Sequence, residues 1–258
     1  MIRRIGRLAA LLALCALSLQ LYFLARVALM AVVDPQSTTF QRSEIWRLAV
    51  EKRSVPWSQD WRPYDKLGDA LKRAVIASED ARFADHTGVE WDAIEAAWER
   101  NQRAQARAER INSSSQAAAQ RGRTAGAVPA RPAAQAKVVG GSTITQQLAK
   151  NLFLSGERSL ARKGQEFVLT MMLEGLLSKQ RILEIYLNNV EWGEGLFGAQ
   201  AAARHYFHVD AERLGALQAA RLAVMLPAPK RFEKKPASPY VLDRAATVAA
   251  RMGAVELP

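Results

Sequence analysis

Apolar residues recur at spacings of three and four along most of this chain, and this spacing is typical of helices with one buried face. Helices are predicted over residues 67–80, from Trp91 onward, and over 144–152, 162–176, 179–190, 199–206 and 210–226. Asp210 is the natural N-cap of the last helix, and Pro227 stops it. No stretch alternates with period two for long. The pattern therefore predicts a mostly α fold around one core, without internal repeats.

The first 33 residues follow a different pattern. Three arginines precede an apolar run, Leu8 to Val33, in which Arg26 is the one charged residue. About 20 apolar residues cross a bilayer core, so the run is long enough if Arg26 reaches the far interface. The leading arginines favour a cytoplasmic tip and place everything after Asp34 outside the cytoplasmic membrane. A cleaved signal peptide is the alternative, but the run is long for one and lacks a clear cleavage site, so a single-pass transmembrane anchor at 1–33 is favoured.

Composition divides the rest of the chain. Residues 34–66 carry three prolines and three tryptophans, which discourages a long helix and indicates a membrane-proximal segment. The main domain is predicted over 67–245, followed by a C-terminal tail at 246–258. Inside it, residues 103–139 hold twelve alanines, six arginines and one acid, with almost no large apolar side chain. Such a segment buries too little apolar surface to offset its ordering entropy, so we predict a disordered, solvated insertion. Its first part could instead prolong the Trp91 helix, and contact of its cations with anionic membrane is the alternative to full solvation.

Charge and cysteine content narrow the class of partner. The net charge is +11, which the arginines before the anchor cannot explain alone. Nucleic acid would be one anionic partner, but the sequence has no zinc-finger, helix-turn-helix or aromatic RNA-binding motif. A domain tethered outside a membrane meets anionic lipid headgroups and phosphorylated lipids instead, and these are the expected partners. The lone Cys15 lies in the anchor, so no intrachain disulfide can form.

Candidate chemistry begins where the first helix of the main domain ends, at Glu79 and Asp80. A helix C-terminus carries partial negative charge and the neighbouring acid adds more, so both raise the pKa of Glu79 and make it a better proton acceptor. His86 is expected to be structural and to hold the following loop, with catalysis as the alternative. From these residues alone, a solvated acid pair that merely ends a helix is the simpler interpretation.

The second candidate stretch is the Gly-Gly-Ser-Thr sequence at 140–143, which opens a helix. Ser142 is a natural N-cap, and a helix N-terminus beside glycines offers unpaired N–H groups to a phosphate. Gln146, Gln147 and Lys150 follow on or near one face and suit a sugar-phosphate ligand. The lysine comes too late for a Walker loop, so a nucleoside triphosphate site is not expected. An ordinary junction between loop and helix is the alternative.

A third group consists of Arg158, Arg162 and Lys163, with Glu166 one helical turn later. Lys163 and Glu166 could simply pair on a helix surface, which is worth only about 0.2–0.5 kcal/mol. If Glu79 is catalytic, however, a second carboxylate flanked by cations is what glycosyl chemistry needs near a pyrophosphate leaving group.

Together these stretches resemble the bacterial peptidoglycan glycosyltransferase family, which also supplies a domain of bifunctional penicillin-binding proteins. The matching motifs are Glu79-Asp80-x-x-Phe83-x-x-His86-x-Gly88, Gly140-Gly141-Ser142-Thr143-Ile144-Thr145-Gln146-Gln147-Leu148-x-Lys150-Asn151, Arg162-Lys163-x-x-Glu166, Lys179-x-x-Ile182-Leu183-Glu184-x-Tyr186-Leu187-Asn188 and Ala201-Ala202-x-x-x-Tyr206-Phe207. They span nearly everything between Leu67 and Pro229. The resemblance implies a lysozyme-like helical domain in its monofunctional, biosynthetic form. The insertion at 103–139 is long for the family, which puts substrate contacts within it in doubt.

By this resemblance, Glu79 is the general base that deprotonates the 4-hydroxyl of the acceptor sugar, and Glu166 is the second catalytic glutamate, which lies near the leaving group or orients the donor. The other site residues are expected to bind sugars and phosphates or to shape the site: Asp80, Phe83, Ser142, Thr143, Gln146, Gln147, Lys150, Arg158, Arg162 and Lys163. The implied reaction polymerises lipid II with inversion at the anomeric carbon and releases undecaprenyl pyrophosphate on the periplasmic side of the bacterial inner membrane. The tyrosine of the fourth motif, Tyr186, is expected to be core.

The implied partners are lipid II, the growing lipid-linked glycan chain and membrane lipids, with cell wall or division proteins as further candidates and no nucleic acid. No cofactor is expected to be required, and a divalent cation such as Mg²⁺ is expected at most to assist the pyrophosphate. One rival function is a glycan-cleaving enzyme of lysozyme-like fold, which would not need the cations. The other is a non-enzymatic, membrane-tethered glycan-binding scaffold, against which the intact motifs argue.

Overall fold

A computed structural model describes residues 2–122, 141–154, 156–157 and 159–258. The chain forms two compact units, Met1–Gly88 with Thr143–Pro258, and Val89–Ser142. Helices dominate both units, and the strands of the described residues amount to one two-stranded sheet. The predicted mostly α fold is therefore confirmed.

Helix α1 (Ile2–Leu29) contains the apolar run. Its stretch Arg4–Leu29 is long and apolar enough to cross a membrane by length and composition, a test that a signal sequence would also pass. The last turns of α1 nevertheless pack into the first unit. Val27 is fully buried, and the Phe23 ring meets Phe153 edge-on with 5.3 Å between centroids. The end of α1 thus contributes to the core.

The segment at 34–66 contains no long helix, as its prolines predicted. Helix α2 (Thr39–Arg47) continues into a π-helical turn (Leu48–Lys52), and a 3-10 turn (Tyr64–Lys66) follows. Of the tryptophans, Trp57 stacks on Phe197 at 4.6 Å between ring centroids, whereas Trp46 is 73% exposed. One tryptophan of this segment therefore packs against the domain, while another is exposed to solvent.

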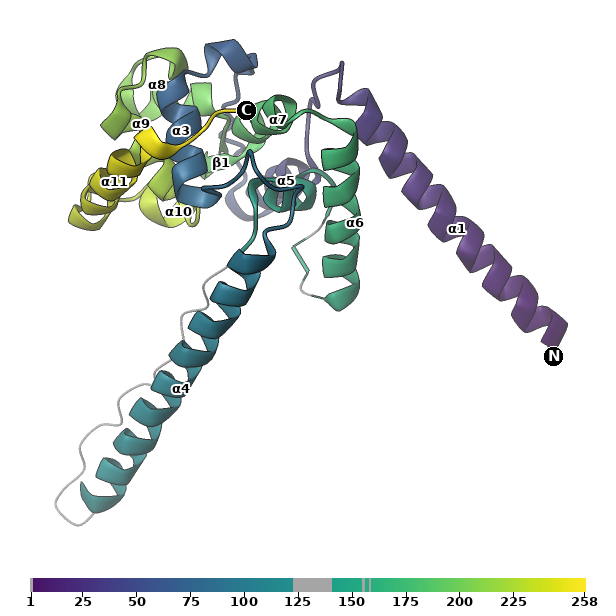
Figure 1. The fold of residues 1–258 in the computed structure, drawn as a ribbon, viewed down its shortest axis with the longest axis horizontal. Coiled ribbons are helices and arrows are strands. Elements are labelled where there is room, and N and C mark those ends of the chain that lie inside the picture. The colour runs from purple at the N-terminus through teal and green to yellow at the C-terminus, as the bar shows by residue number, and fades with distance from the viewer. Residues whose placement is uncertain (1, 123–140, 155, 158) are drawn as a thin grey trace. The chain divides into compact units, whose positions relative to one another are not determined.

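The rest of the first unit is a bundle of short helices. They are α3 (Asp69–Glu79), α5 (Ile144–Phe153), α6 (Leu160–Leu176), α7 (Lys179–Asn189), α8 (Ala199–Phe207), α9 (Ala216–Met225), α10 (Pro229–Phe232) and α11 (Pro239–Arg251), with 3-10 turns at Ala211–Arg213 and Met252–Ala254. Helices α3 and α11 pack on α9, and α5 packs on α6 and α7 (Figure 1). Trp192, Tyr186 and Phe83 are among the largest fully buried side chains. This core fixes the end of α3 beside α5.

The helix predicted over 210–226 is interrupted, which corrects the sequence prediction. The 3-10 turn Ala211–Arg213 is separated from α9 because Leu214 and Gly215 have extended backbone. Asp210 does not cap this turn through its side chain. Its carboxylate instead accepts hydrogen bonds from Gln200 (2.6 Å) and Arg204 (3.0 Å).

A small hairpin after α7 was not predicted. Strands β1 (Glu191–Gly193) and β2 (Leu196–Phe197) pair antiparallel around a turn at Gly195. Gly195 has φ +71°, and a Cβ there would lie 1.9 Å from the carbonyl oxygen of Pro56. Only glycine satisfies both conditions, so this residue sets the close approach of the proximal segment to the hairpin.

The boundary predicted at 245, before the C-terminal tail, falls inside α11. Val248, Met252 and Val255 beyond it are buried.

The second unit contains helix α4 (Trp91–Gly122), which begins where the sequence predicted. Residues 103–122 prolong this helix, which is one of the two outcomes expected for the first part of the insertion, and Arg103, Arg107 and Arg110 on it are exposed. Residues 123–139 lie outside the described residues, so disorder there stays a prediction.

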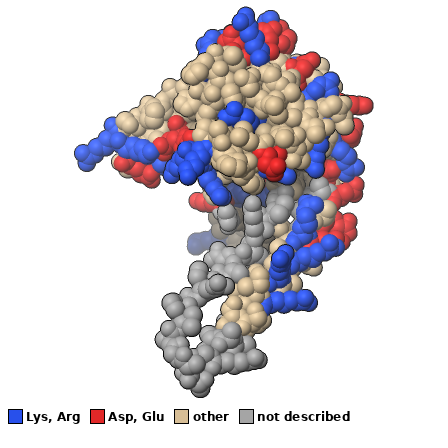
Figure 2. Space-filling model, turned by 90° about the vertical axis from the view of Figure 1, so that its left-hand side faces the viewer, with Lys and Arg blue, Asp and Glu red and all other residues tan. Residues whose placement is uncertain are grey.

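Basic and acidic side chains are interspersed on the face of the molecule drawn in Figure 2. The net charge of +11 is therefore not gathered into one patch on this face. Ion pairs link elements distant in sequence, such as Lys230 with Glu44 (2.6 Å) and Arg47 with Glu194 (2.6 Å).

Candidate active site

Glu79 is the last residue of α3. The helix buries Leu71, Ala74 and Val75 completely on its core face and ends because Asp80 adopts a non-helical backbone, with φ −162° and ψ 74°. Glu79 is half-buried at this end. The predicted placement of the acid at a helix C-terminus is therefore confirmed.

The Glu79 carboxylate is held in place from α5. Gln147 donates from Nε2 to Glu79 Oε2 (3.0 Å), and the Tyr186 hydroxyl donates to Gln147 Oε1 (3.0 Å). Burial is the main cause that raises the pKa of Glu79; the charge of Asp80 acts in the same direction, while hydrogen bonds from Gln147 and Ser78 oppose it. The predicted direction is confirmed, but burial rather than the neighbouring acid is the leading cause.

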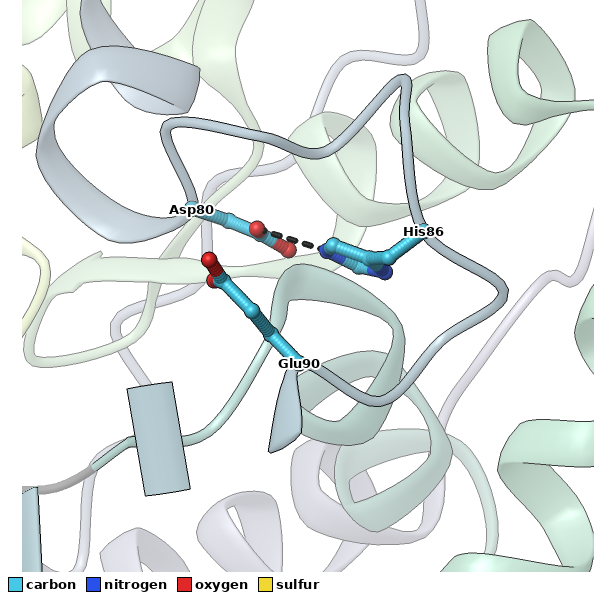
Figure 3. Close-up of side chains that lie close together, drawn as sticks. All are labelled: Asp80, His86 and Glu90. Carbon is cyan, nitrogen blue, oxygen red and sulfur yellow. Dashed lines mark hydrogen bonds and ion pairs between the residues drawn. The ribbon is translucent and has the colours of Figure 1, made fainter. Parts of the chain in front are cut away.

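Asp80 joins the loop after α3 to the start of α5. Its Oδ1 lies 2.8 Å from His86 Nε2, the contact drawn as a dashed line in Figure 3, and its Oδ2 accepts from the backbone N–H of Ile144 at 3.0 Å. His86 Nδ1 accepts from the Gly88 N–H (3.0 Å), so its proton is on Nε2 and Asp80 is the acceptor. His86 thus holds the loop, as predicted, and Asp80 has both oxygens engaged within the protein.

The N-cap of α5 is Thr143, not Ser142, which corrects the sequence prediction. Thr143 Oγ1 accepts from the Gln146 N–H (3.2 Å), and Gln146 Oε1 accepts from the Thr143 N–H (3.2 Å), which forms a reciprocal capping box. Thr143 Oγ1 also donates to the carbonyl of Gly88 at 2.7 Å. Thr143 and Gln146 are therefore occupied in holding the helix start, and Ser142 is left exposed.

Glu166, the second carboxylate, is buried on α6 with 3% of its surface exposed. Arg162 Nη1 donates to its Oε2 (2.9 Å), and Lys163 Nζ pairs with its Oε1. The Arg162 Nε–H is buried and has no hydrogen-bond partner among the residues that the structure describes. A buried donor of this kind is the type of group that a bound anion satisfies.

Lys150 on α5 lies within electrostatic range of both carboxylates. Desolvation is the main cause that lowers its pKa, and Arg162 and Lys163 add to the effect, whereas Glu166 and Glu79 raise it. Lys150 therefore belongs to one electrostatic group with both glutamates, and this group draws on α3, α5 and α6.

Two more predicted site residues, Phe83 and Arg158, are not part of this electrostatic group. Phe83 is fully buried, and the Lys179 ammonium lies 4.5 Å from its ring centroid. Phe83 belongs to the hydrophobic core, and its predicted contact with substrate stays a prediction. Arg158 lies outside the described residues.

Tyr186 is the residue whose role sequence reasoning missed. It is core, as predicted, with 1% exposure, but its hydroxyl also fixes the amide that holds Glu79. The position of Tyr186 in the fourth motif could have indicated a functional role. Helical spacing alone, however, predicts only that the tyrosine is buried and not which group its hydroxyl bonds.

This arrangement defines a class of protein. A glutamate whose pKa is raised and a second, buried glutamate lie within electrostatic range of the same cation, Lys150, and two further cations pair with the second glutamate. Residue types of this kind suit acid–base chemistry beside an anionic group. The Transglycosylase family description matches residues 48–112 and 114–253.

The chain belongs to this family, whose domain is lysozyme-like, and it is a peptidoglycan glycosyltransferase of cell wall synthesis. Several similar proteins carry the name biosynthetic peptidoglycan transglycosylase, among them the following three. The protein of Burkholderia thailandensis is 52% identical over 94% of this chain and 83% of its own length. That of Burkholderia pseudomallei is 50% identical over the same shares, and that of Paraburkholderia xenovorans is 47% identical over 97% and 92%.

Proposed function

We propose that this enzyme polymerises lipid II into linear glycan strands as a monofunctional, single-pass protein, with its catalytic domain on the periplasmic side of the bacterial inner membrane. The observation that carries the proposal is the half-buried Glu79, held by Gln147 and grouped with Lys150, Arg162, Lys163 and Glu166.

In the proposed reaction, Glu79 takes the proton of the acceptor sugar's 4-hydroxyl as that oxygen attacks the anomeric carbon of the growing chain. The bond from that carbon to the pyrophosphate oxygen breaks with inversion. Arg162, Lys163 and Lys150 stabilise the negative charge that develops on the departing undecaprenyl pyrophosphate. Glu166 holds Arg162 and Lys163 in position through its two ion pairs.

The packing of α1 supports a retained anchor. Cleavage after the apolar run would remove buried Val27 and the Phe23 contact with Phe153 from the folded unit. Intact-mass measurement of the protein extracted from membranes tests this point, because loss of the first 20 to 30 residues, roughly the length of a signal peptide, would contradict it.

No cofactor is part of the proposal. A divalent cation such as Mg²⁺ would share with Arg162 and Lys163 the task of balancing pyrophosphate charge, and activity measured with excess chelator against added Mg²⁺ tests this role.

The deciding experiment is polymerisation of lipid II by purified wild type and by Glu79→Gln. Loss of a positioned general base costs about 10²–10⁴-fold in rate. Glu256→Gln is the matched control, because Glu256 is exposed on the same unit and should retain full activity. The proposal fails if wild type forms no polymer, if it cleaves glycan instead, or if Glu79→Gln polymerises as fast as wild type.

A further inference from the structure

Arg181, in the first turn of α7, joins this helix to the end of the anchor. Its Nε donates to the backbone carbonyl of Met30 at 2.8 Å, and its Nη2 pairs with Asp34 Oδ1 at 2.7 Å. Its Nη1 pairs with Glu184, about one turn further along α7, at 2.8 Å. Each nitrogen of the guanidinium thus has a partner of its own. The proposed reaction uses none of these groups.

The bonds of Arg181 fix a direction as well as a charge. The ion pair with Glu184 alone would balance the guanidinium charge, yet two more bonds cross to the place where the anchor ends. The Arg181 side chain is 15% exposed, and its Cζ lies 5.8 Å from the ring centroid of Trp61. A guanidinium is planar and presents its donors in a rigid fork, so it holds these partners in one arrangement.

The same helix supports the catalytic carboxylate. Tyr186 follows Arg181 by five residues, about 7.5 Å along α7, and its hydroxyl donates to Gln147, which in turn donates to Glu79. Tyr186 is 1% exposed, so this part of α7 is held in the core. One buried helix therefore contacts the anchor through Arg181 and supports Glu79 through Tyr186.

Other contacts hold the anchor nearer its middle. The amides of Gln20 and Gln165 donate to each other at 2.8 and 3.1 Å, which joins α1 to α6. The Phe23 ring meets Phe153 of α5. The bonds of Arg181 act further along, where the chain leaves α1. The anchor is thus joined to α5, α6 and α7, each of which carries residues of the candidate site.

This arrangement matters because the lipid-linked substrate of the proposed reaction is itself held in a bilayer. The bilayer sets the height of the substrate, whereas the contact between domain and anchor sets the height of Glu79. Reacting atoms have to come within about 3–3.5 Å of one another, so the two heights have to agree closely.

We propose that Arg181 is a positioning residue that fixes the catalytic domain on its membrane anchor, so that Glu79 meets a substrate held in the bilayer. The inference rests on the proposed function and its retained anchor, and it adds the residue that sets the site against the membrane. Arg181 touches no reacting group and acts through the end of α1.

Two variants break this contact from opposite sides and spare the fold. Arg181→Lys keeps a positive charge beside Glu184, so the half-buried carboxylate stays paired, but one ammonium cannot replace the fork that reaches Met30 and Asp34. Asp34→Asn removes the charged partner on the anchor side and leaves the pair between Arg181 and Glu184 in place.

Arg204→Lys is the matched control. Arg204 also pairs with two aspartates, Asp60 and Asp210, in the same unit, but it makes no contact with the anchor. Each protein is assayed with lipid II in proteoliposomes and with a short-chain lipid II analogue in detergent solution, where no bilayer sets the height of the substrate. Thermal unfolding of each variant checks that the fold is kept.

The expected effect is confined to the substrate in the bilayer. Arg181→Lys and Asp34→Asn should each lower kcat/KM for lipid II in proteoliposomes about tenfold, which is less than the roughly 10²-fold cost of a 1 Å misplacement, because the other anchor contacts remain. Their kcat/KM for the short-chain analogue should equal that of wild type. The double variant should lose no more than the weaker single variant, because both changes break one contact. Arg204→Lys should match wild type with both substrates.

A spectroscopic measurement reports on the position of the anchor directly. Cys15 is the one cysteine of the chain and is exposed on α1, and Leu217 is 60% exposed on α9, so spin labels on Cys15 and on Leu217→Cys span the contact. Pulsed electron paramagnetic resonance in proteoliposomes should give a narrow distance distribution with Arg181 present. Arg181→Lys should broaden it, and Arg204→Lys should leave it narrow.

The outcomes separate the two proposals. If wild type polymerises neither substrate, the proposed function fails. If wild type is active but both variants keep its rate in proteoliposomes, or if the distance distribution stays narrow in Arg181→Lys, Arg181 does not position the domain. Equal losses with both substrates would also overturn the inference, because they would show a change within the site and not in its relation to the membrane.

Discussion

Replacing Gln147 with methionine should shift the pH dependence of the reaction. Methionine keeps the length of the side chain but removes the Nε2 donor that lies 3.0 Å from Glu79 Oε2. That bond favours the ionised carboxylate, and without it the proton is held more tightly. The active form of Glu79 is the deprotonated one, so activity is lost as pH falls through its pKa. In Gln147→Met this loss should occur at higher pH.

The size of the shift follows from the strength of the bond. A hydrogen bond to a charged group contributes about 1.5–3 kcal/mol, and one pH unit corresponds to about 1.36 kcal/mol. Glu79 is only half-buried, so water replaces part of the lost bond. The acid limb should therefore move up by about one pH unit. Tyr186→Phe should move it in the same direction by less, because Gln147 is retained and only its orientation is released.

The measurement is the pH profile of kcat/KM for lipid II polymerisation, which reports ionisation in the free enzyme. Gln180→Met is the control, since Gln180 is exposed on α7, and its side chain donates to the carbonyl of Pro258 at 2.9 Å and not to Glu79. An acid limb that stays in place in Gln147→Met, or moves to lower pH, would refute the assignment of Gln147 as the partner of an ionised Glu79.

Three further predictions concern stability. Glu79→Gln should raise Tm above that of wild type at neutral pH and lose this advantage below about pH 4.5. Burial raises the pKa of Glu79, so the contribution of this residue to stability is fully present below its ordinary pKa of 4.5 and is lost as pH rises through its pKa in the folded protein. An equal Tm difference at both pH values would contradict this. Gly195→Ala should lower the free energy of unfolding, measured by chemical denaturation, by about 1–3 kcal/mol, because φ is +71° and the Cβ would clash with Pro56. The control Gly253→Ala, where a Cβ meets open space, should change the free energy of unfolding little. Deleting residues 104–136 should leave Tm of the remaining chain nearly unchanged, because the hydrophobic core cluster draws its residues from the first unit, and a fall of more than about 4 °C would show a structural role.

The sequence predicted where the helices lie and which residues form the site more closely than it predicted the interactions that each site residue makes. Helix ends at Glu79 and Leu176 follow from periodicity and were placed within a residue or two. The interruption before α9 was missed because alanine-rich sequence continues across Gly215, and only packing decides where such a helix stops. The hairpin at Gly195 is too short to show a period of two.

The role of a polar side chain depends on the groups with which it forms hydrogen bonds, and tertiary packing decides which groups these are. Ser142 and Thr143 are both good caps by type, but Thr143 has Gln146 at the position that closes a capping box. Glu79 was expected to have a raised pKa because of the helix end and Asp80, whereas burial, the larger cause, cannot be read from spacing. Tyr186 gained its role only when α7 packed against α5.

The bonds from Asp80 to Ile144 and from Thr143 to Gly88 also bear on how this family of chains can change in length. They close a loop of more than fifty residues at its base, with both partners in the first unit. The entropy of closing a flexible loop grows only with the logarithm of its length, so doubling the loop costs about 0.6 kcal/mol. Evolution can therefore lengthen or shorten the segment between these residues at little cost to stability. A protein engineer could use the same point to insert a fluorescent domain that reports on this enzyme.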